Sequence, residues 1–180
     1  MNNVGYHAGG NVSDPEAMQQ SEHDQRFMQL ALEEASRATA VGEVPIAAIL
    51  VRHGDVLAAA HNLRESLQDP TAHAEMIVIR KVAEQLNSWR LTDTTLYVTL
   101  EPCPMCAGAI VQSRIERLVF GAWDPKAGAC GSLFNIPSAR RLNHRVQVVG
   151  GILEKESQTL LQEFFRPKRY GTASIPDRRA

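Results

Sequence analysis

The stretch Thr95-Leu-Tyr-Val-Thr-Leu-Glu-Pro-Cys-Pro-Met-Cys106 joins an apolar run to a pair of cysteines. The run Thr95–Leu100 contains β-branched and aromatic side chains, which predicts a strand. The residues Pro104–Ser113 predict a helix, so Cys103 and Cys106 lie where a strand ends and a helix begins. With three cysteines in 180 residues, about 0.03 Cys-x-x-Cys patterns are expected by chance. The pair therefore indicates a functional site.

The spacing of the two cysteines fits metal binding. Side chains three residues apart share a helix face, so the sulfur atoms of Cys103 and Cys106 can reach one ion. A helix N-terminus also lowers the pKa of a thiol, which favours the thiolate that a metal needs. Thiolates combined with an imidazole are typical ligands of Zn²⁺.

A second pattern, His73-Ala74-Glu75, lies upstream at the start of another expected helix. Alone it is weak, because about 0.4 His-x-Glu patterns are expected by chance. Combined with the cysteines, His73 completes three ligands and leaves the fourth tetrahedral position of zinc open, as in catalytic sites. Glu75 is then the candidate base beside a bound water, placed to take its proton and deliver it to a leaving nitrogen.

Other interpretations of these residues stay open on spacing alone. A structural zinc site needs a fourth protein ligand, and Cys130 and His144 do not form a second closely spaced pair. A thioredoxin-like redox pair would leave the His-x-Glu pattern unexplained, and a non-catalytic zinc-binding module is a further alternative. We expect Cys130 to be an ordinary buried thiol, and spacing alone makes Asn62 a turn residue.

The rest of the chain alternates between helical and strand patterns. Apolar residues at three- and four-residue steps predict helices, and short apolar runs between turn residues predict strands. The first two strands flank a glycine-containing turn and predict a hairpin, and Pro167 is expected to end the last helix. This order favours an α/β layer with helices packed on a sheet. Helices are expected over residues 24–40, 74–86, 104–113 and 152–165, and strands over 46–51, 56–60, 95–100, 117–121 and 145–149.

The length of the chain favours one domain. Residues 1–20 are polar and show no apolar period, so we expect them to form a disordered extension. Residues 21–170 are expected to form a single zinc-dependent domain, and residues 171–180 a flexible tail.

Composition excludes several classes of protein. Hydrophobic residues make up 44% of the chain and charged residues 22%, which is ordinary for a soluble globular protein. The longest apolar run, Pro45–Val51, is far shorter than the roughly 20 residues that span a bilayer. We expect no secretory signal, because no basic residue followed by an apolar stretch stands at the N-terminus. The low, odd cysteine count argues for a reducing compartment, and we expect a cytoplasmic protein.

The charges are unevenly distributed along the chain. The formal net charge of −1 does not by itself indicate a nucleic-acid binder. Residues 1–44 contain two basic and seven acidic side chains, whereas residues 137–180 contain nine basic and four acidic ones. The basic C-terminal end could meet a polyanion, although a solvated tail is the simpler explanation.

The pattern His-x-Glu upstream of Pro-Cys-x-x-Cys is the signature of zinc-dependent nucleobase deaminases. Beyond this signature, the sequence resembles the bacterial tRNA adenosine deaminases of the cytidine/deoxycytidylate deaminase superfamily, from about residue 24 to about residue 170. The matching stretches are Asp69–Glu75, Thr95–Ala109, Ser113–Ile115, Phe120–Ala122, Asp124–Lys126, Gly131–Leu133 and Asn143–Arg145.

The resemblance implies a three-layer α/β/α sandwich around a central mixed five-stranded sheet, as in cytidine deaminases, and a homodimer. It implies hydrolytic deamination of the wobble adenosine in a tRNA anticodon to inosine, with release of ammonia. The RNA partner would be an anticodon stem-loop, expected from an arginine tRNA. One zinc ion per chain would be held by His73, Cys103 and Cys106, and Glu75 would shuttle protons. The residues implied in contacts with the target nucleoside and the RNA are Asn62, Arg64, Asp124, Lys126, Asn143, Phe165 and Arg169.

Two questions stay open at the level of sequence. Deaminases of free bases or nucleosides, of guanine or cytosine type, share the zinc motif but need no contacts with phosphates. Trp123 has two interpretations, since an exposed indole could stack on a base whereas a buried one would only pack.

Overall fold

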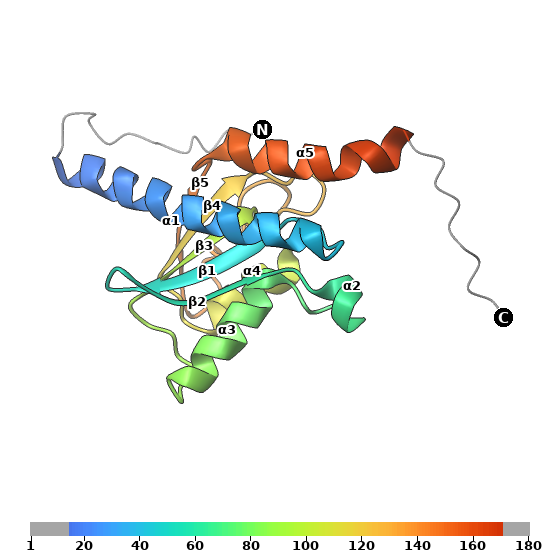
Figure 1. Cartoon of the computed structure of the whole chain (residues 1–180). Helices are drawn as coiled ribbons and strands as arrows, with labels where there is room; N and C mark the ends of the chain where they lie inside the picture. Colours follow the sequence, from blue (N-terminus) through green and yellow to red (C-terminus); the bar gives the residue numbers. More distant parts are fainter. Residues whose placement is uncertain (1–14, 171–180) are drawn as a thin grey trace.

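The computed structural model describes residues 15–170, with side chains as far as Arg166. The expectations for residues 1–14 and 171–180 therefore lie outside the described residues. Within residues 15–170 no helix combines the length and apolar character that crossing a bilayer requires. The elements (Figure 1) are α1 (Pro15–Ala40), β1 (Ala47–Arg52), β2 (Asp55–His61), α2 (Arg64–Leu67), α3 (Ala74–Gln85), β3 (Thr94–Leu100), α4 (Pro104–Gln112), β4 (Arg117–Ala122), β5 (Gln147–Gly150) and α5 (Glu154–Tyr170).

The strands form one mixed sheet in the order β2-β1-β3-β4-β5. Strand β1 pairs antiparallel with β2 and with β3, whereas β3, β4 and β5 are parallel neighbours. The turn between β1 and β2 consists of His53 and Gly54, whose φ angles are 51° and 87°. Two positive φ values in a two-residue turn match the type I′ turn that suits a twisted hairpin, so the expected hairpin is confirmed.

Helices cover both faces of the sheet (Figure 1). Helices α1 and α5 lie on one face, where Phe27, Ile49 and Tyr97 belong to one buried cluster. Helices α3 and α4 lie on the other face, where Val78 and Ile110 belong to the larger buried cluster. The expected three-layer α/β/α sandwich with a mixed five-stranded sheet is confirmed.

Parallel pairing brings the ends of several strands to one edge of the sheet. Leu100 and Ala122, the last residues of β3 and β4, pair with each other, so the segments after them leave at the same edge. Strand β2 runs in the same direction and ends there as well, at His61. Open α/β sheets carry their sites at this carboxyl edge, and the segments that contain the predicted metal ligands, Asn62 and Asp124 begin there.

Helix α1 begins at Pro15, so residues 15–20 are helical and the prediction of disorder is wrong for them. Residues 15–23 are all exposed, which explains why no apolar period revealed the helix. Asp24 anchors α1 to the sheet. Its buried carboxylate accepts hydrogen bonds from the two terminal guanidinium nitrogens of Arg117 (2.7 and 2.6 Å) and from the Tyr97 hydroxyl (3.0 Å). This contact joins residues 93 positions apart, beyond the reach of local patterns.

The other end of the chain also differs from the expectation. Helix α5 continues through Pro167 to Tyr170. A proline inside a helix removes one backbone donor, and here only the last residues of the helix follow it. The loop expected before α3 contains the short helix α2, and the last strand begins at Gln147 rather than Arg145.

The Asp24 anchor gives a prediction about stability. The Arg117 side chain is only 14% exposed, so Asp24→Asn leaves a buried guanidinium without a counter-charge. Breaking a buried ion pair in this way costs about 3–5 kcal/mol, and we expect urea unfolding to report a loss of that size in the free energy of unfolding.

Asp93→Asn is the matched control, because Asp93 is 54% exposed and lies 3.5 Å from Arg52. An exposed pair of this kind contributes at most about 1 kcal/mol. Equal losses in the two variants would contradict the anchoring role of Asp24.

Candidate active site

Two helices begin at the carboxyl edge of the sheet and carry the predicted metal ligands. His73 occupies the N-cap position of α3, and Cys103 occupies that of α4, both with extended backbone. Neither side chain caps its own helix, so both remain available to a ligand. Cys106 lies in the first turn of α4 and is buried. Sequence reasoning placed these residues correctly at the two helix starts.

The three side chains converge. The Nδ1 atom of His73 lies 3.8 Å from the Sγ atom of Cys103 and 3.6 Å from that of Cys106. Tetrahedral zinc with its usual bonds to nitrogen and sulfur would hold such atoms about 3.6 Å apart, so the donor set fits this ion. Among the described residues, these three form the one group of histidine, cysteine and acidic side chains close enough to share a metal. Within residues 15–170, that group offers three ligands and leaves the fourth tetrahedral position open.

Hydrogen bonding polarises the two thiols. Contact with Cys106 and with the His73 ring lowers the pKa of Cys103 to about 4, although burial acts in the opposite direction. The same contact with Cys103, together with burial, raises the pKa of Cys106. The pKa of His73 is raised by its hydrogen bond to Cys103. One thiolate is therefore already favoured, and binding of a cation would release a proton from the second thiol.

Glu75 follows His73 in the first turn of α3 and is 3% exposed. Burial raises the pKa of its carboxyl group. Its Oε2 atom is buried and has no hydrogen-bond partner in the protein. A buried polar atom without a partner is rare and needs an explanation, and a water or substrate at the metal site would provide the missing partner.

Asn62 has a double role at the start of α3. Its Oδ1 atom accepts a hydrogen bond of 3.0 Å from the backbone N–H of Ala74, the first residue of the helix. Because a backbone N–H needs an acceptor, this contact fixes which side of the amide is oxygen. The amide nitrogen is then the group that Asn62, which is 4% exposed and lines the pocket, can offer to a ligand.

One pocket of about 220 Å³ is lined by His73, Cys103, Glu75 and Asn62, among other residues. Three of the residues expected to contact substrate or RNA line it, namely Asn62, Arg64 and Asp124. Lys126 lies two residues further along the same loop and is exposed. The pocket is lined by Val44, Ile46, Asn62, Arg64, His73, Glu75, Leu100, Glu101, Cys103, Asp124 and Ala127.

The other expected RNA contacts lie elsewhere. Asn143 accepts a hydrogen bond of 3.0 Å from Arg114, which follows the end of α4, whereas Cys103 precedes its start. Phe165 is 39% exposed on α5 and packs edge-on against Phe164. The side chain of Arg169 lies outside the described residues. The roles of these residues stay predictions, because the pocket of this chain does not include them.

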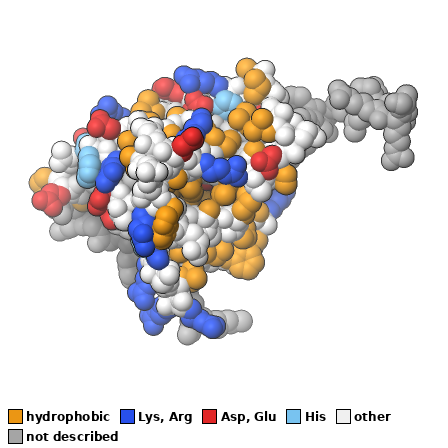
Figure 2. All heavy atoms as spheres, turned by 90° about the horizontal axis from the view of Figure 1, so that it is seen from below, with side chains coloured by type: hydrophobic (Ala, Val, Ile, Leu, Met, Phe, Trp, Pro, Cys, Tyr) orange, Lys and Arg blue, Asp and Glu red, His pale blue; other side chains and the backbone are white. Residues whose placement is uncertain are grey.

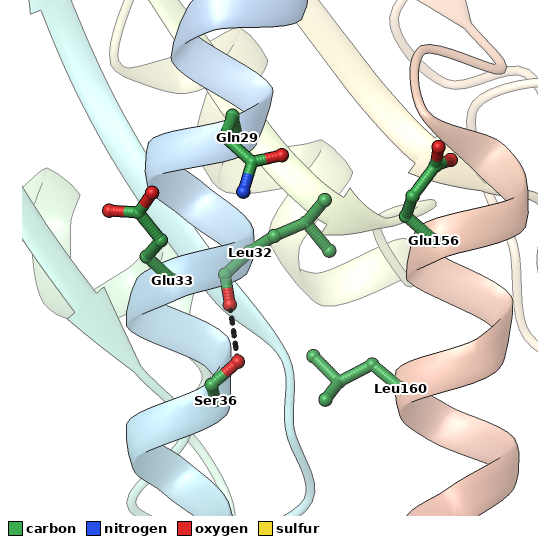
Figure 3. Close-up of a pocket in the computed structure, with 6 residues that line it drawn as sticks. All are labelled: Gln29, Leu32, Glu33, Ser36, Glu156 and Leu160. Atoms are coloured by element: carbon green, nitrogen blue, oxygen red, sulfur yellow. Dashed lines mark hydrogen bonds between the residues drawn. The ribbon is translucent and has the colours of Figure 1, made fainter.

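Helices α1 and α5 enclose a second hollow of about 200 Å³ (Figure 3). The side chains of Leu32 and Leu160 point toward each other across it. The Ser36 hydroxyl donates to the carbonyl of Leu32 within α1, at 2.9 Å. This hollow contains neither histidine nor cysteine among its lining residues, so it offers none of the chemistry of the first pocket.

Two buried carboxylates shape the pocket: Glu101, whose place directly before the cysteine pair predicts a position at the pocket rim, and Glu43, which no sequence pattern predicts. Glu43 is 1% exposed and accepts a hydrogen bond of 2.7 Å from the backbone N–H of Ser66 in α2. Burial alone would raise the pKa of Glu43, but its bonds from Ser66 and Glu65 outweigh that effect and lower it. Glu101 plays a comparable part for the loop after β4. Glu43 belongs to no recognisable motif, so only the folded chain reveals its part, and the hydrogen bonds of Glu101 likewise appear only in the folded chain.

Trp123 packs rather than stacks. Its ring lies edge-on to Phe120, with centroids 4.7 Å apart. A Cβ atom at Gly150 would come within 2.7 Å of the indole and 2.5 Å of the Phe120 ring. The indole is therefore wedged against β4 and β5, which favours the packing interpretation over a platform for a base.

Comparison with known proteins shows the family to which the chain belongs. The family model of MafB19-like deaminases matches residues 22–169. A tRNA-specific adenosine deaminase of Bacillus subtilis (strain 168) is 53% identical over 146 residues, which are 81% of this chain and 91% of that protein. The chain belongs to the family of tRNA-specific adenosine deaminases. The resemblance inferred from the motifs is thus confirmed.

Other members of the tRNA-specific adenosine deaminase family and solved structures extend the comparison. The family member from Aquifex aeolicus (strain VF5) is 50% identical and covers 79% of this chain and 94% of its own length. A structure from studies of A-to-I editing by tRNA:A34 deaminases at the wobble position of transfer RNA aligns with a TM-score of 0.73 and 48% identity, over 76% of this chain and 99% of its own. A guanine deaminase from Nitrosomonas europaea aligns with a TM-score of 0.65 over 91% of this chain and 97% of its own, but at 23% identity it shares the fold alone.

The ligand assignment predicts the outcome of two serine substitutions. Cys103→Ser removes the thiolate favoured at the start of α4, so we expect the purified protein to lose its zinc. Cys130→Ser is the control, because Cys130 is buried but stands outside the ligand group. Elemental analysis by mass spectrometry measures both. Full zinc content in Cys103→Ser, or its loss in Cys130→Ser, would overturn the assignment.

Proposed function

We propose that the protein is a zinc-dependent hydrolase that converts the wobble adenosine of a tRNA anticodon to inosine and releases ammonia. The observation that carries this proposal is a three-ligand group, His73, Cys103 and Cys106, opening into a pocket where Glu75 presents an unpartnered oxygen. Relatives named as tRNA-specific adenosine deaminases at 43–53% identity support the choice of substrate.

One zinc ion per chain, held by the three ligands, would supply the Lewis acidity that makes water a nucleophile near neutral pH. In the reaction a bond forms between the water oxygen and C6 of adenine, and the bond from C6 to the amino nitrogen breaks. Glu75 accepts one proton of the attacking water and delivers it to the leaving nitrogen, which departs as ammonia, while the second proton of the water ends on N1 of the product. Its burial in the wall of the pocket keeps bulk water away from this transfer.

The shape of the pocket bears on how RNA binds. A volume of about 220 Å³ admits a base but not a folded nucleic acid, so the target nucleotide must turn out of its stack to enter. The amide nitrogen of Asn62 faces the entering base. Arg64 and Asp124 stand at the rim, and the exposed Lys126 is placed to meet the RNA backbone, where lysine contacts supply affinity.

We further infer that the functional unit is a homodimer, and the arginine tRNA stays a prediction that the family resemblance alone supports. Leu133 and Phe134, in the loop after β4, are 53% and 57% exposed. Figure 2, which views the α3/α4 side, shows hydrophobic side chains gathered over part of that face. Exposed apolar patches of this kind mark interaction surfaces. The cytoplasm stays the predicted location, on the ground of the cysteine count.

An anticodon stem-loop with a wobble adenosine tests the proposed substrate. We expect inosine to form in this RNA and its formation to slow as the salt concentration rises, because contacts with phosphates release counterions. Nucleoside analysis of the digested product measures the conversion. Free guanine, cytosine and adenosine serve as rival substrates, and activity on these with none on the stem-loop would favour the alternative of a free-base deaminase.

The proton shuttle predicts that Glu75→Gln keeps its zinc and its fold but loses turnover. The amide has the same shape as the carboxyl group and cannot accept the proton, so we expect the rate to fall by about 10²–10⁴-fold, as for a lost general base. Glu84→Gln, exposed on the same helix, is the control and should keep the wild-type rate. Turnover of Glu75→Gln near the wild-type rate would assign the proton transfer to another group.

A further inference from the structure

Glu101 is a buried carboxylate with no role in the chemistry described above. It is 2% exposed, and none of the ion pairs among the described residues includes it. Its Oε1 atom accepts from the backbone N–H groups of Cys130 and Ser132, both at 2.9 Å. Its Oε2 atom accepts from the backbone N–H of Asp124 at 3.0 Å and from the Ser132 hydroxyl. Four donors from one loop thus replace the solvent of a buried anion.

The loop closes tightly around this carboxylate. A Cβ atom at Gly128 would lie 2.2 Å from the Oε2 atom of Glu101 and 2.6 Å from the carbonyl oxygen of Asp124. The φ angle of Gly128 lies outside the left-handed region, so space and not backbone conformation requires glycine here. We call residues 124–132 the rim loop, since Asp124 and Ala127 line the pocket.

The same contacts tie the rim loop to the metal ligands. Glu101 precedes Cys103 by two residues, and its own N–H donates to the carbonyl of Ala122 at 2.8 Å. The N–H of Ala129 donates to the carbonyl of Pro102, also at 2.8 Å. Segment 101–103 is therefore bonded to the chain just before the rim loop, at Ala122, and to the interior of the loop, at Ala129 and through the Glu101 side chain.

Inside the rim loop, Asp124 shapes the turn that presents Lys126. Its Oδ1 atom accepts from the N–H groups of Lys126 (2.9 Å) and Ala127 (3.2 Å). Because the N–H of Asp124 itself is held by Glu101, the position of the Lys126 backbone follows from that of the Glu101 carboxylate.

We propose that Glu101 is a positioning residue that holds the rim loop at a fixed distance from the zinc ligands. Lys126 can then contact the RNA backbone while the target base occupies the metal site. The proposal rests on the proposed function for its substrate. It assigns the carboxylate to RNA binding through Lys126, and Glu75 alone to proton transfer.

A carboxylate is needed because all four donors require acceptors. In Glu101→Gln the amide presents one acceptor oxygen and one NH₂ group. In either orientation of the amide, the NH₂ group therefore faces two of the four N–H and O–H donors and cannot accept from them. The side chain keeps its size, and the loop loses its fixed position rather than its packing.

The experiment compares stem-loop kinetics of the wild-type protein, Glu101→Gln, Lys126→Ala and the double variant. We expect Glu101→Gln to raise KM about ten-fold, the effect of losing hydrogen bonds to a charged group, while kcat and zinc content stay near wild type. Because Glu101 acts through Lys126, the double variant should be no worse than the poorer single variant. Effects that multiply, or a loss confined to kcat, would overturn the proposal.

Hydrogen exchange followed by NMR tests the positioning without any activity. The N–H groups of Asp124, Cys130 and Ser132 should be protected in the wild-type protein and lose protection in Glu101→Gln. Glu116→Gln, which removes an exposed carboxylate at the start of β4, should change neither protection nor KM. Unchanged protection in Glu101→Gln would refute the positioning role.

A smaller change covers the case in which Glu101→Gln fails to fold. Ser132→Ala removes only the hydroxyl donor, and we expect a smaller rise in KM together with partial loss of protection at Asp124. No change in either quantity would contradict the proposal. If the wild-type protein does not deaminate the stem-loop, the proposed function fails, whereas the exchange data still decide the role of Glu101.

Discussion

The convergence of two helix N-termini at the carboxyl edge of the sheet is the constraint on which the rest of the site depends. It brings His73 and Cys103, 30 residues apart in the chain, to within 3.8 Å of each other. The positive ends of the helix dipoles meet at the same place, which favours thiolates. Because β1 runs antiparallel to both of its neighbours, β2 and β3 end at the same edge of the sheet, and the segments that lead to α3 and α4 leave from that edge.

Buried carboxylates show how the fold separates structural from reactive groups. Asp24 is neutralised by Arg117, and Glu43 and Glu101 accept hydrogen bonds from backbone N–H groups. Among the described residues, Glu75 is the one buried carboxylate with an oxygen atom that accepts nothing. The partners of Asp24, Glu43 and Glu101 hold a charge in place. Glu75 instead keeps an oxygen free to accept a proton, which the proposed role as proton shuttle requires.

The sequence allowed the metal site to be predicted because its signal is local. The spacing of Cys103 and Cys106 and the positions of the helix starts follow from short-range patterns, as does the His53-Gly54 turn. The start of α1, the packing of Trp123 and the part played by Glu101 depend on contacts between distant segments, which no local pattern contains. Asn143 shows the same limit, since the motif that suggested it does not reveal that it bonds Arg114 beyond the far end of α4.

Zinc X-ray absorption spectroscopy of the full chain can show whether the three-ligand site keeps its fourth position open. With His73, Cys103 and Cys106 as the ligands, the spectrum should fit two sulfur atoms at about 2.3 Å and two nitrogen or oxygen atoms at about 2.0–2.2 Å, the fourth being solvent that an added ligand displaces. A fit that requires three or more sulfur atoms would place Cys130 or another thiol on the metal. The site would then be closed, and the metal could not activate a water for the proposed deamination.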